Sequence, residues 1–484
     1  MTAESYSSSS QPLDLKEQEV KIASEVEPSY DADPRNPYNW PLWKKWMTMA
    51  VAYWVAILVG INATSFTTVT DALSEEFNIS NGFFEYSFFA VTSWNAAAAI
   101  VPLATLPMME TFGFRIGYLS AYVLFVIFII PQCVAPNFAT LVVCRTFAGA
   151  FGGTIQNAAD GIAANIFFTV QERILPLTLY AFTLMFGVTI GPVFGALLKP
   201  LDWRWVFWLQ LIINGATIPV LYYGLKETRG SVILSKLNKT EKVTDKTAAL
   251  EELKETVSRA AMLLITEPTV TSFTTWSAFS FGLVFISTQS VPVVYSVVYD
   301  WPTYSGGLVQ TALALGEAIG IVAFLYQNRI YVRSAAHNLE KPGVPVPESI
   351  LHLSIPSTVF GLAGGLFMYG WTTVNGTHWI VPTIGLVLIG FGIMCIVIAA
   401  AVYVTDSYSG YAASAIAAVA FGENTFAAFL PLAAKPMYLR LGFQWASSLL
   451  AFIALALALA PTILLWKGAV IRSKSKAIQK MSLN

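Results

Sequence analysis

The stretch HWIVPTIGLVLIGFGIMCIVIAAAVY, residues 378–403, decides the fold class of this chain. It contains no aspartate, glutamate, lysine or arginine along its whole length. An apolar run of roughly 18 or more residues predicts a helix that spans the hydrocarbon core of a bilayer, because lipid offers no hydrogen-bond partner to an unpaired backbone group. Apolar helices in soluble cores are usually shorter, so this stretch predicts a membrane span.

Other stretches of the chain follow the same pattern, and together they predict an all-α polytopic membrane protein with twelve transmembrane helices. The stretches rich in glycine, alanine and polar residues are typical of helices that pack among other helices or line a cavity. The remaining predicted spans lie near 47–69, 83–107, 117–136, 138–160, 174–198, 203–225, 270–298, 303–328, 351–373, 411–433 and 442–466.

Composition supports a membrane protein and argues against several other classes. Hydrophobic residues make up 55% of the chain and charged residues 12%, about half the charged share of a soluble domain. A formal net charge of −1 and the lack of a basic stripe argue against a nucleic-acid partner. The three cysteines have no paired spacing, and the three histidines have no metal or triad spacing. We therefore expect neither an enzyme nor a cofactor, and no phosphate-binding GxxxxGK[ST] motif supplies ATP-driven transport.

A long polar interval divides the twelve predicted spans into six and six. Two pseudo-symmetric six-helix halves that rock about a central site are a common transporter design. The predicted organisation is a disordered tail at 1–40, a first half at 41–225, a linker at 226–265, a second half at 266–466 and a C-terminal tail at 467–484.

The basic residues predict the orientation in the membrane. With both termini in the cytoplasm, 23 of the 28 lysines and arginines lie on the cytoplasmic side. Only Lys199, Arg204, Lys435 and Arg440 lie outside, and Arg145 falls within a span. Cytoplasmic loops normally hold the excess of positive charge, so both termini are predicted to be cytoplasmic.

Several short motifs occur in a fixed order along the chain. They are DPRNPYNWP (33–41), PLATLPMMETFGFR (102–115), RTFAG (145–149), GVTIGPVFG (187–195), WRWVFW (203–208), ETRGSVIL (227–234), and a last stretch from Tyr411 through PL (431–432) to MYLRLG (437–442).

Their order and spacing resemble those of the fungal twelve-span drug:proton antiporters of the major facilitator superfamily, over nearly the whole chain after residue 30. The resemblance implies proton-coupled alternating access, with export from the cytoplasm as the usual direction. The implied energy source is the proton gradient, and the implied partners are the lipid bilayer, protons and a small-molecule substrate. The resemblance also implies a monomeric protein in the plasma membrane.

The loop after the second span is a candidate cytoplasmic gate. Gly113 permits a tight turn, and Glu110 and Arg115 can make charge-assisted contacts. We expect Glu172 and Arg173 in the next cytoplasmic loop to be their partners. The alternative is that the arginines serve only as positive-inside anchors.

The fifth span holds small residues on one helix face. Gly187, Gly191, Pro192 and Gly195 follow at spacings that permit close approach of a second helix, and Pro192 removes a backbone hydrogen bond. The antiporter motif of the family itself allows close helix packing. These residues can therefore be both an ordinary small-residue packing face and the antiporter motif.

Four ionisable residues at membrane depth are candidates for the substrate or proton site, because a charge there is expensive. They are Arg145, Asp160, Glu317 and Glu423. Asp160 stands where the family usually has glycine, and Glu423 where it usually has arginine. One carboxylate neutralising Arg145 is the structural alternative. Nearby polar candidates on the fourth and eleventh spans are Gln156, Asn157 and Asn424.

The predicted function is secondary active efflux of small organic molecules, with drugs, polyamines, organic acids and secondary metabolites as candidate substrates. The excess of carboxylates over arginine at membrane depth favours cationic or protonatable substrates. The alternatives are a proton-symport nutrient importer of the same fold and a non-transporting membrane sensor or scaffold.

Overall fold

The computed structural model describes residues 33–79, 89–198, 200–237, 257–338, 343–374, 376–475 and 477–479. Within these residues every regular element is helical. Eleven helices in this part of the chain are long and apolar enough to cross a membrane, and a bent helix pair raises the number to as many as twelve. The predicted all-α polytopic fold is therefore confirmed.

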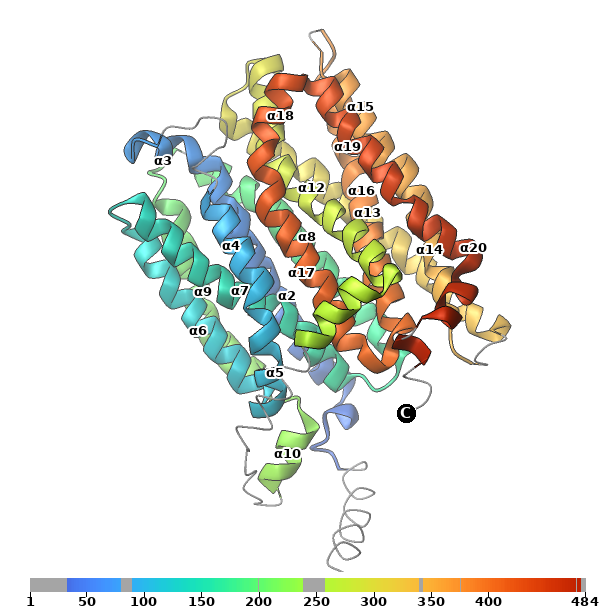
Figure 1. Cartoon of the computed structure of the whole chain (residues 1–484). Coiled ribbons are helices and arrows are strands. Elements are labelled where there is room, and N and C mark those ends of the chain that lie inside the picture. The colour runs from blue at the N-terminus through green and yellow to red at the C-terminus, as the bar shows by residue number, and fades with distance from the viewer. Residues whose placement is uncertain are drawn as a thin grey trace, which may run out of the picture.

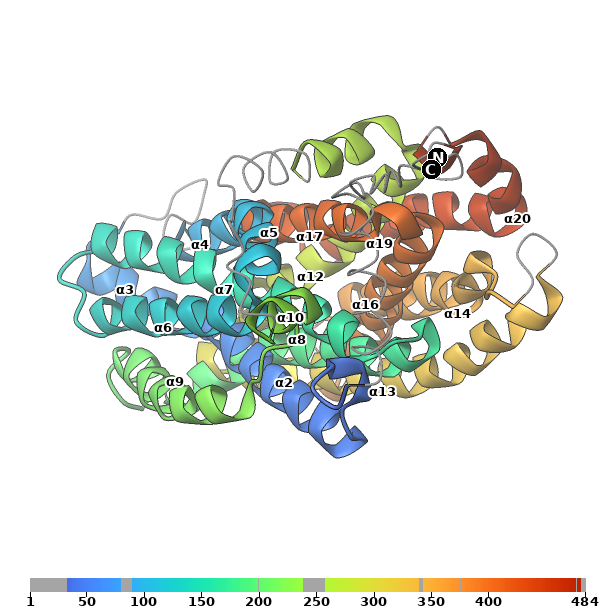
Figure 2. The ribbon, with the colours of Figure 1, turned by 90° about the horizontal axis from the view of Figure 1, so that it is seen from below.

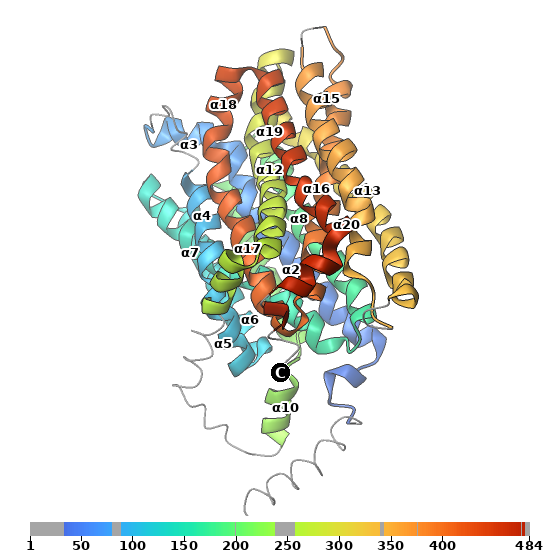
Figure 3. The same ribbon diagram turned by 45° about the vertical axis from the view of Figure 1, so that its right-hand side comes forward.

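The helices form two groups in chain order, which Figure 2 shows side by side. The first group contains α2 (Leu42–Thr64), η2 (Ser65–Val69), α3 (Thr70–Glu76), α4 (Phe89–Ile100), α5 (Pro102–Phe112), α6 (Phe114–Cys133), α7 (Phe138–Ile166), α8 (Val170–Leu198) and α9 (Trp205–Gly224). A short α10 (Gly230–Leu237) follows, and Figures 1 and 3 show it apart from the bundle.

The second group begins at Pro268, after a short apolar helix at Val257–Thr266. It contains α12 (Pro268–Tyr299), α13 (Thr303–Ser334), η5 (Pro347–Ile350), α14 (Leu351–Pro356), the π-helical η6 (Ser357–Ala363), α15 (Gly364–Thr372), α16 (Ile380–Ser407), α17 (Ala412–Phe429), η8 (Leu430–Ala433), α18 (Ala434–Leu441), α19 (Phe443–Leu457) and α20 (Leu459–Lys474).

One predicted span is bent, and two others change helix type along their length while each remains a single span. The second span consists of α4 and α5, which meet at 45° where Pro102 begins α5. Residues 83–88 of that prediction lie outside the described residues. Pro431 lies in the first turn of η8, where α17 ends. The ninth span contains the π-helical η6 immediately after Pro356. Proline removes a backbone donor and its ring displaces a carbonyl of the preceding turn, which explains the bend and the changes of helix type at these positions.

We call the end of the bundle where α2 begins and α20 ends the terminal end, and the other end the far end (Figure 1). Of the predicted disordered tail, residues 1–32 lie outside the described residues. Residues 33–40 are described, and they pack on the terminal end of the first half. Trp40 is buried, and the Lys45 ammonium donates to the Tyr38 carbonyl at 2.8 Å.

The two halves meet mainly through two helix pairs, α8 with α13 and α4 with α17. At the far end, a Cβ placed on Gly307 of α13 would lie 2.8 Å from the carbonyl oxygen of Pro192 in α8. The Thr92 hydroxyl of α4 donates to the Ala428 carbonyl of α17 at 2.8 Å. The far ends of the halves are therefore in direct contact in this structure.

Candidate transport site

Arg145 of α7 is fully buried, and its guanidinium binds backbone carbonyls. Its Nε donates to Ala90 of α4 at 2.9 Å, and one Nη donates to Ala63 of α2 at 2.9 Å. Both Nη groups also donate to the Asn62 carbonyl, and the charge lies 5.0 Å from the centre of the Phe66 ring. The carbonyls near the C-terminal end of α2 carry partial negative charge, which stabilises a cation there.

This geometry does not support the structural alternative for the acidic residues. Among the described residues, no carboxylate forms an ion pair with Arg145. Arg145 instead holds α2, α4 and α7 of one half together. It is a structural group in this conformation, and neither Glu317 nor Glu423 neutralises it.

Glu317 lies where the two halves meet. Its side chain, in α13, has 0% of its surface exposed. Its Oε1 accepts a hydrogen bond of 2.5 Å from the Thr189 hydroxyl of α8 in the other half. Its Oε2 is buried without a hydrogen-bond partner in the described structure. Glu317 therefore joins the halves through one oxygen and keeps a second one available for a proton.

Asp160 of α7 and Glu423 of α17 make up a second acidic site, with one residue from each half. Glu423 accepts a hydrogen bond from the Ser277 hydroxyl of α12. Asp160 and Glu423 act on each other as like charges across the two halves. Within the described chain, Asp160 forms no ion pair or hydrogen bond. The structure thus brings two of the predicted acidic residues together and leaves Glu317 as a separate site.

The predicted polar neighbours are used mainly within their own helices. Asn157 donates to the Gly153 carbonyl at 2.7 Å, and Asn424 donates to the Ala420 carbonyl at 2.9 Å. Gln156 is buried one helical turn before Asp160, and therefore on the same face of α7. These amides leave oxygen atoms that can accept hydrogen bonds from a ligand or water.

The loop after α5 is organised by an acid that our sequence analysis did not select. Gly113 has φ of +109°, and a Cβ there would lie 2.7 Å from Oε2 of Glu227. The backbone N–H groups of Phe114 and Arg115 donate to the two Glu227 oxygens at 3.1 and 3.2 Å. The Arg115 guanidinium donates to the Tyr222 carbonyl at 3.1 Å. Glu227 is the first residue of the motif ETRGSVIL (227–234), and its place in that motif was the one sequence feature that could have identified it as a partner of the gate loop.

The predicted contacts of Glu110 and Arg115 with Glu172 and Arg173 are not present in the described structure. Glu110 instead lies 3.7 Å from the guanidinium of Arg229. Arg173 binds the carbonyls that end α7, with its Nε 2.7 Å from the Phe167 oxygen. The partners of the gate loop thus come from the segment after α9, because that segment turns back under α5 and α6.

The glycines of α8 allow it to pack closely on α2. A Cβ on Gly187 would lie 2.7 Å from the Ile57 carbonyl oxygen, and one on Gly191 would lie 2.0 Å from the Thr64 hydroxyl. A Cβ on Gly195 would lie 2.4 Å from the Ser65 carbonyl oxygen. Thr189, between the first two glycines, faces Glu317 on α13. Helix α8 therefore packs on α2 of its own half through its glycines, and forms a hydrogen bond to α13 of the other half through Thr189.

Apolar spans in two halves, with buried carboxylates where the halves meet, define a membrane transport protein. The sequence profile of the Major Facilitator Superfamily matches residues 52–431. The chain therefore belongs to the Major Facilitator Superfamily. It is a secondary transporter and not an enzyme, as the sequence predicted.

Relatives of similar length come from fungi. The chain is 32% identical to "MFS transporter cpaT" of Aspergillus oryzae over 457 residues, which cover 92% of this chain and 91% of that protein. It is 30% identical to "Efflux pump radE" of Floropilus chiversii, over 95% of this chain and 87% of that protein. It is also 30% identical to the "Ascochitine biosynthesis cluster MFS transporter" of Didymella fabae, over 93% of this chain and 88% of that protein. These relatives support the predicted fungal efflux-type family.

Solved structures share the fold at low identity. The proton:xylose symporter XylE superposes with a TM-score of 0.63 at 16% identity, over 88% of this chain and 96% of that one. The human organic anion transporter MFSD10 superposes with a TM-score of 0.60 at 15% identity, over 87% of this chain and 100% of that one. Both matches establish the fold alone.

Proposed function

We propose that the protein exports small organic molecules from the cytoplasm in exchange for protons, by alternating access. The observation that carries this proposal is Glu317, a fully buried carboxylate that bonds to Thr189 across the two halves. Burial without a cation disfavours the charged form of a carboxylate. Loss of the proton therefore favours a conformation in which the Glu317 carboxylate reaches water. Because Glu317 lies between α13 and α8, the two halves must separate at this contact for water to enter.

The described conformation fits one state of such a cycle. The far ends are closed by the contacts of Gly307 and Thr92. The excess of lysine and arginine places the terminal end in the cytoplasm. The closed far end would then face the outside, and the structure would correspond to the state whose access is on the cytoplasmic side.

The substrate class is proposed from the relatives. One is named as an efflux pump and another as the transporter of a biosynthesis cluster. Small secondary metabolites are therefore the first class to test, with the plasma membrane as the location and a monomer as the working unit.

The test is metabolite profiling of cells that lack or overproduce the protein, with and without a protonophore. Export that rises with protein level and collapses with the protonophore supports the proposal. Uptake that rises with protein level would indicate instead a proton-symport importer of the same fold. No change in either direction would leave a sensor or scaffold as the better account.

A further inference from the structure

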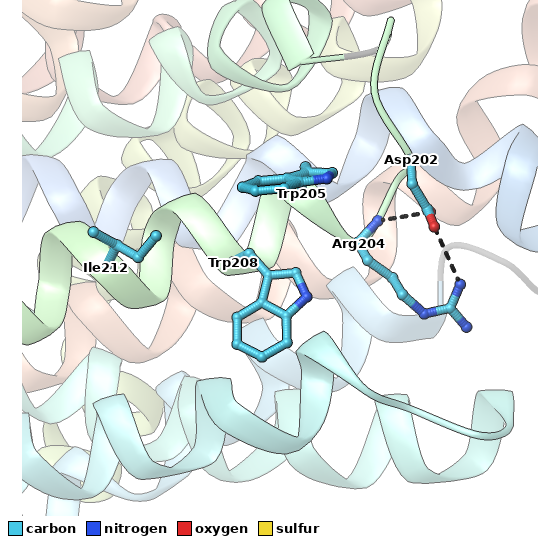
Figure 4. A pocket seen from close by; sticks show the side chains of 5 residues that line it. All are labelled: Asp202, Arg204, Trp205, Trp208 and Ile212. Atoms are coloured by element: carbon cyan, nitrogen blue, oxygen red, sulfur yellow. Dashed lines mark hydrogen bonds and ion pairs between the residues drawn. The ribbon is translucent and has the colours of Figure 1, made fainter.

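A shallow hollow of about 250 Å³ lies on the flank of α9, outside the region where the halves meet. It is lined by Asp202, Arg204, Trp205, Trp208 and Ile212 (Figure 4). The last three follow at spacings of three and four, which places them on one face of the helix. Their exposed fractions are 45%, 37% and 58%, so this face has no cover from the protein.

One end of the hollow is polar, and the described charged groups there, Glu76, Asp202 and Arg204, include two carboxylates and one guanidinium. Arg204 lies 2.7 Å from Glu76 and 3.6 Å from Asp202. Two carboxylates therefore share one guanidinium, and the nearer one, Glu76, also accepts a bond from the Trp203 indole. Asp202 is the less compensated carboxylate, and its side chain is 52% exposed at the hollow.

The two tryptophans present hydrogen-bond donors to this polar end. In Figure 4 the nitrogen-bearing edges of Trp205 and Trp208 lie toward Asp202 and Arg204, while Ile212 lies at the opposite end. Within the described part of the chain, neither indole nitrogen donates to a protein acceptor. A buried or interfacial indole N–H usually finds a partner, so these two are available to a ligand.

The other end of the hollow is apolar and faces away from the bundle. Figure 2 shows α9 at the edge of the first half, where it packs on α6 and α2. Ile212 lies about 10 Å along the helix from Trp205, within the roughly 15 Å depth of half a hydrocarbon core. A tryptophan pair with a charged group at one end and an aliphatic face at the other is the arrangement expected at a membrane interface.

We propose that this hollow binds a zwitterionic phospholipid of the surrounding bilayer. The headgroup ammonium lies at Asp202, the phosphate or ester oxygens accept from the two indole N–H groups, and an acyl chain runs over Trp208 and Ile212. The surplus carboxylate repels a headgroup with net negative charge, which selects zwitterionic over anionic lipid. The proposal is independent of the direction and energy source of transport.

The test is native mass spectrometry of the purified full-length protein with equal amounts of phosphatidylethanolamine, phosphatidylcholine and phosphatidylglycerol. The two zwitterionic lipids should be retained on more of the protein than phosphatidylglycerol. Asp202→Asn should lower the ratio of retained zwitterionic lipid to retained phosphatidylglycerol by about fivefold. Trp208→Ala should reduce retention of both zwitterionic lipids. Trp208→Phe keeps a ring without the N–H and should give an intermediate loss.

The matched control is Trp445→Ala, which removes another exposed tryptophan, at the start of α19, away from the hollow. It should leave lipid retention unchanged. Phosphatidylglycerol retained as well as the zwitterionic lipids, or no effect of Asp202→Asn, would overturn the proposal. Displacement of the lipid by free phosphoethanolamine would also overturn it, because the site would then serve a water-soluble ligand.

Discussion

Arg145 and Glu317 are both fully buried in membrane helices, but their surroundings give them different roles. Arg145 has its donors occupied by backbone carbonyls of its own half. Among the described residues, Glu317 has one hydrogen bond, to the other half, and one oxygen without a partner. A group with all its bonds made inside one rigid half holds that half together. A group with bonds across the halves responds to their movement.

Glu317→Gln should leave the protein folded and able to bind substrate, because the amide oxygen can still accept from Thr189. Transport should become insensitive to the pH gradient, since an amide carries no titrating proton. The measurement is substrate movement in membrane vesicles at imposed pH gradients. Glu75→Gln, at an exposed position of α3, is the control. A Glu317→Gln protein that still follows the gradient would remove Glu317 as the coupling group.

Arg145→Met should destabilise the protein by about 3 kcal/mol or more, because three buried carbonyls would lose charge-assisted bonds. Thermal unfolding of the purified protein measures this loss. Adding Glu423→Gln should not restore stability, since the two side chains are not paired. Restored stability in the double variant would contradict the carbonyl-bound role of Arg145.

At the scale of the helices, apolar length alone predicts the spans, because a helix satisfies its own backbone hydrogen bonds in lipid and tolerates few charged side chains there. Their bends and changes of helix type are harder to predict. The second span bends at Pro102 and the helix type changes at Pro431, whereas α6 continues through Pro131. The outcome depends on whether neighbouring helices stabilise the bend. The bonds of Arg145 and the contact of Glu227 with the gate loop depend on packing between distant segments, which no local pattern contains.

Gly191→Leu should prevent the close packing of α8 on α2, because its Cβ would already lie 2.0 Å from the Thr64 hydroxyl. Overpacking at such a site costs about 1–3 kcal/mol, so melting temperature and transport should both fall. Gly215→Leu is the matched control in α9, where a Cβ meets nothing within 4 Å. Equal melting temperatures for the two variants would show that the α2–α8 contact is not close.

At the scale of the whole molecule, the fold divides into two halves that touch at the far end and across Glu317. Across the halves α13 packs on α8 and α17 packs on α4, contacts between distant segments that no local sequence pattern predicts. The sequence did not predict that residues 36–40 pack on the first half, because polar, proline-rich composition there resembled a disordered tail.

Removing residues 1–32 should not alter the stability of the protein, since this segment offers little apolar surface to bury. Extending the deletion to residue 40 should lower it, because Trp40 is buried and the Tyr38 carbonyl binds Lys45. Yield after membrane extraction and melting temperature give the comparison. A loss already present in the shorter deletion would contradict this division of the tail.

The central claim is that protonation of Glu317 controls movement of the two halves. Leu201 of the first half and Val297 of the second are both exposed near the far end. Spin labels on cysteines at these two positions allow the distance between the halves to be measured by double electron–electron resonance, without a known substrate. The native cysteines are buried. Acid pH should favour a single short distance, because a buried carboxylate without a cation holds its proton. Alkaline pH should add a longer distance, and Glu317→Gln should abolish this response. A wild-type distance that does not change with pH, or an unchanged response in Glu317→Gln, would contradict the claim.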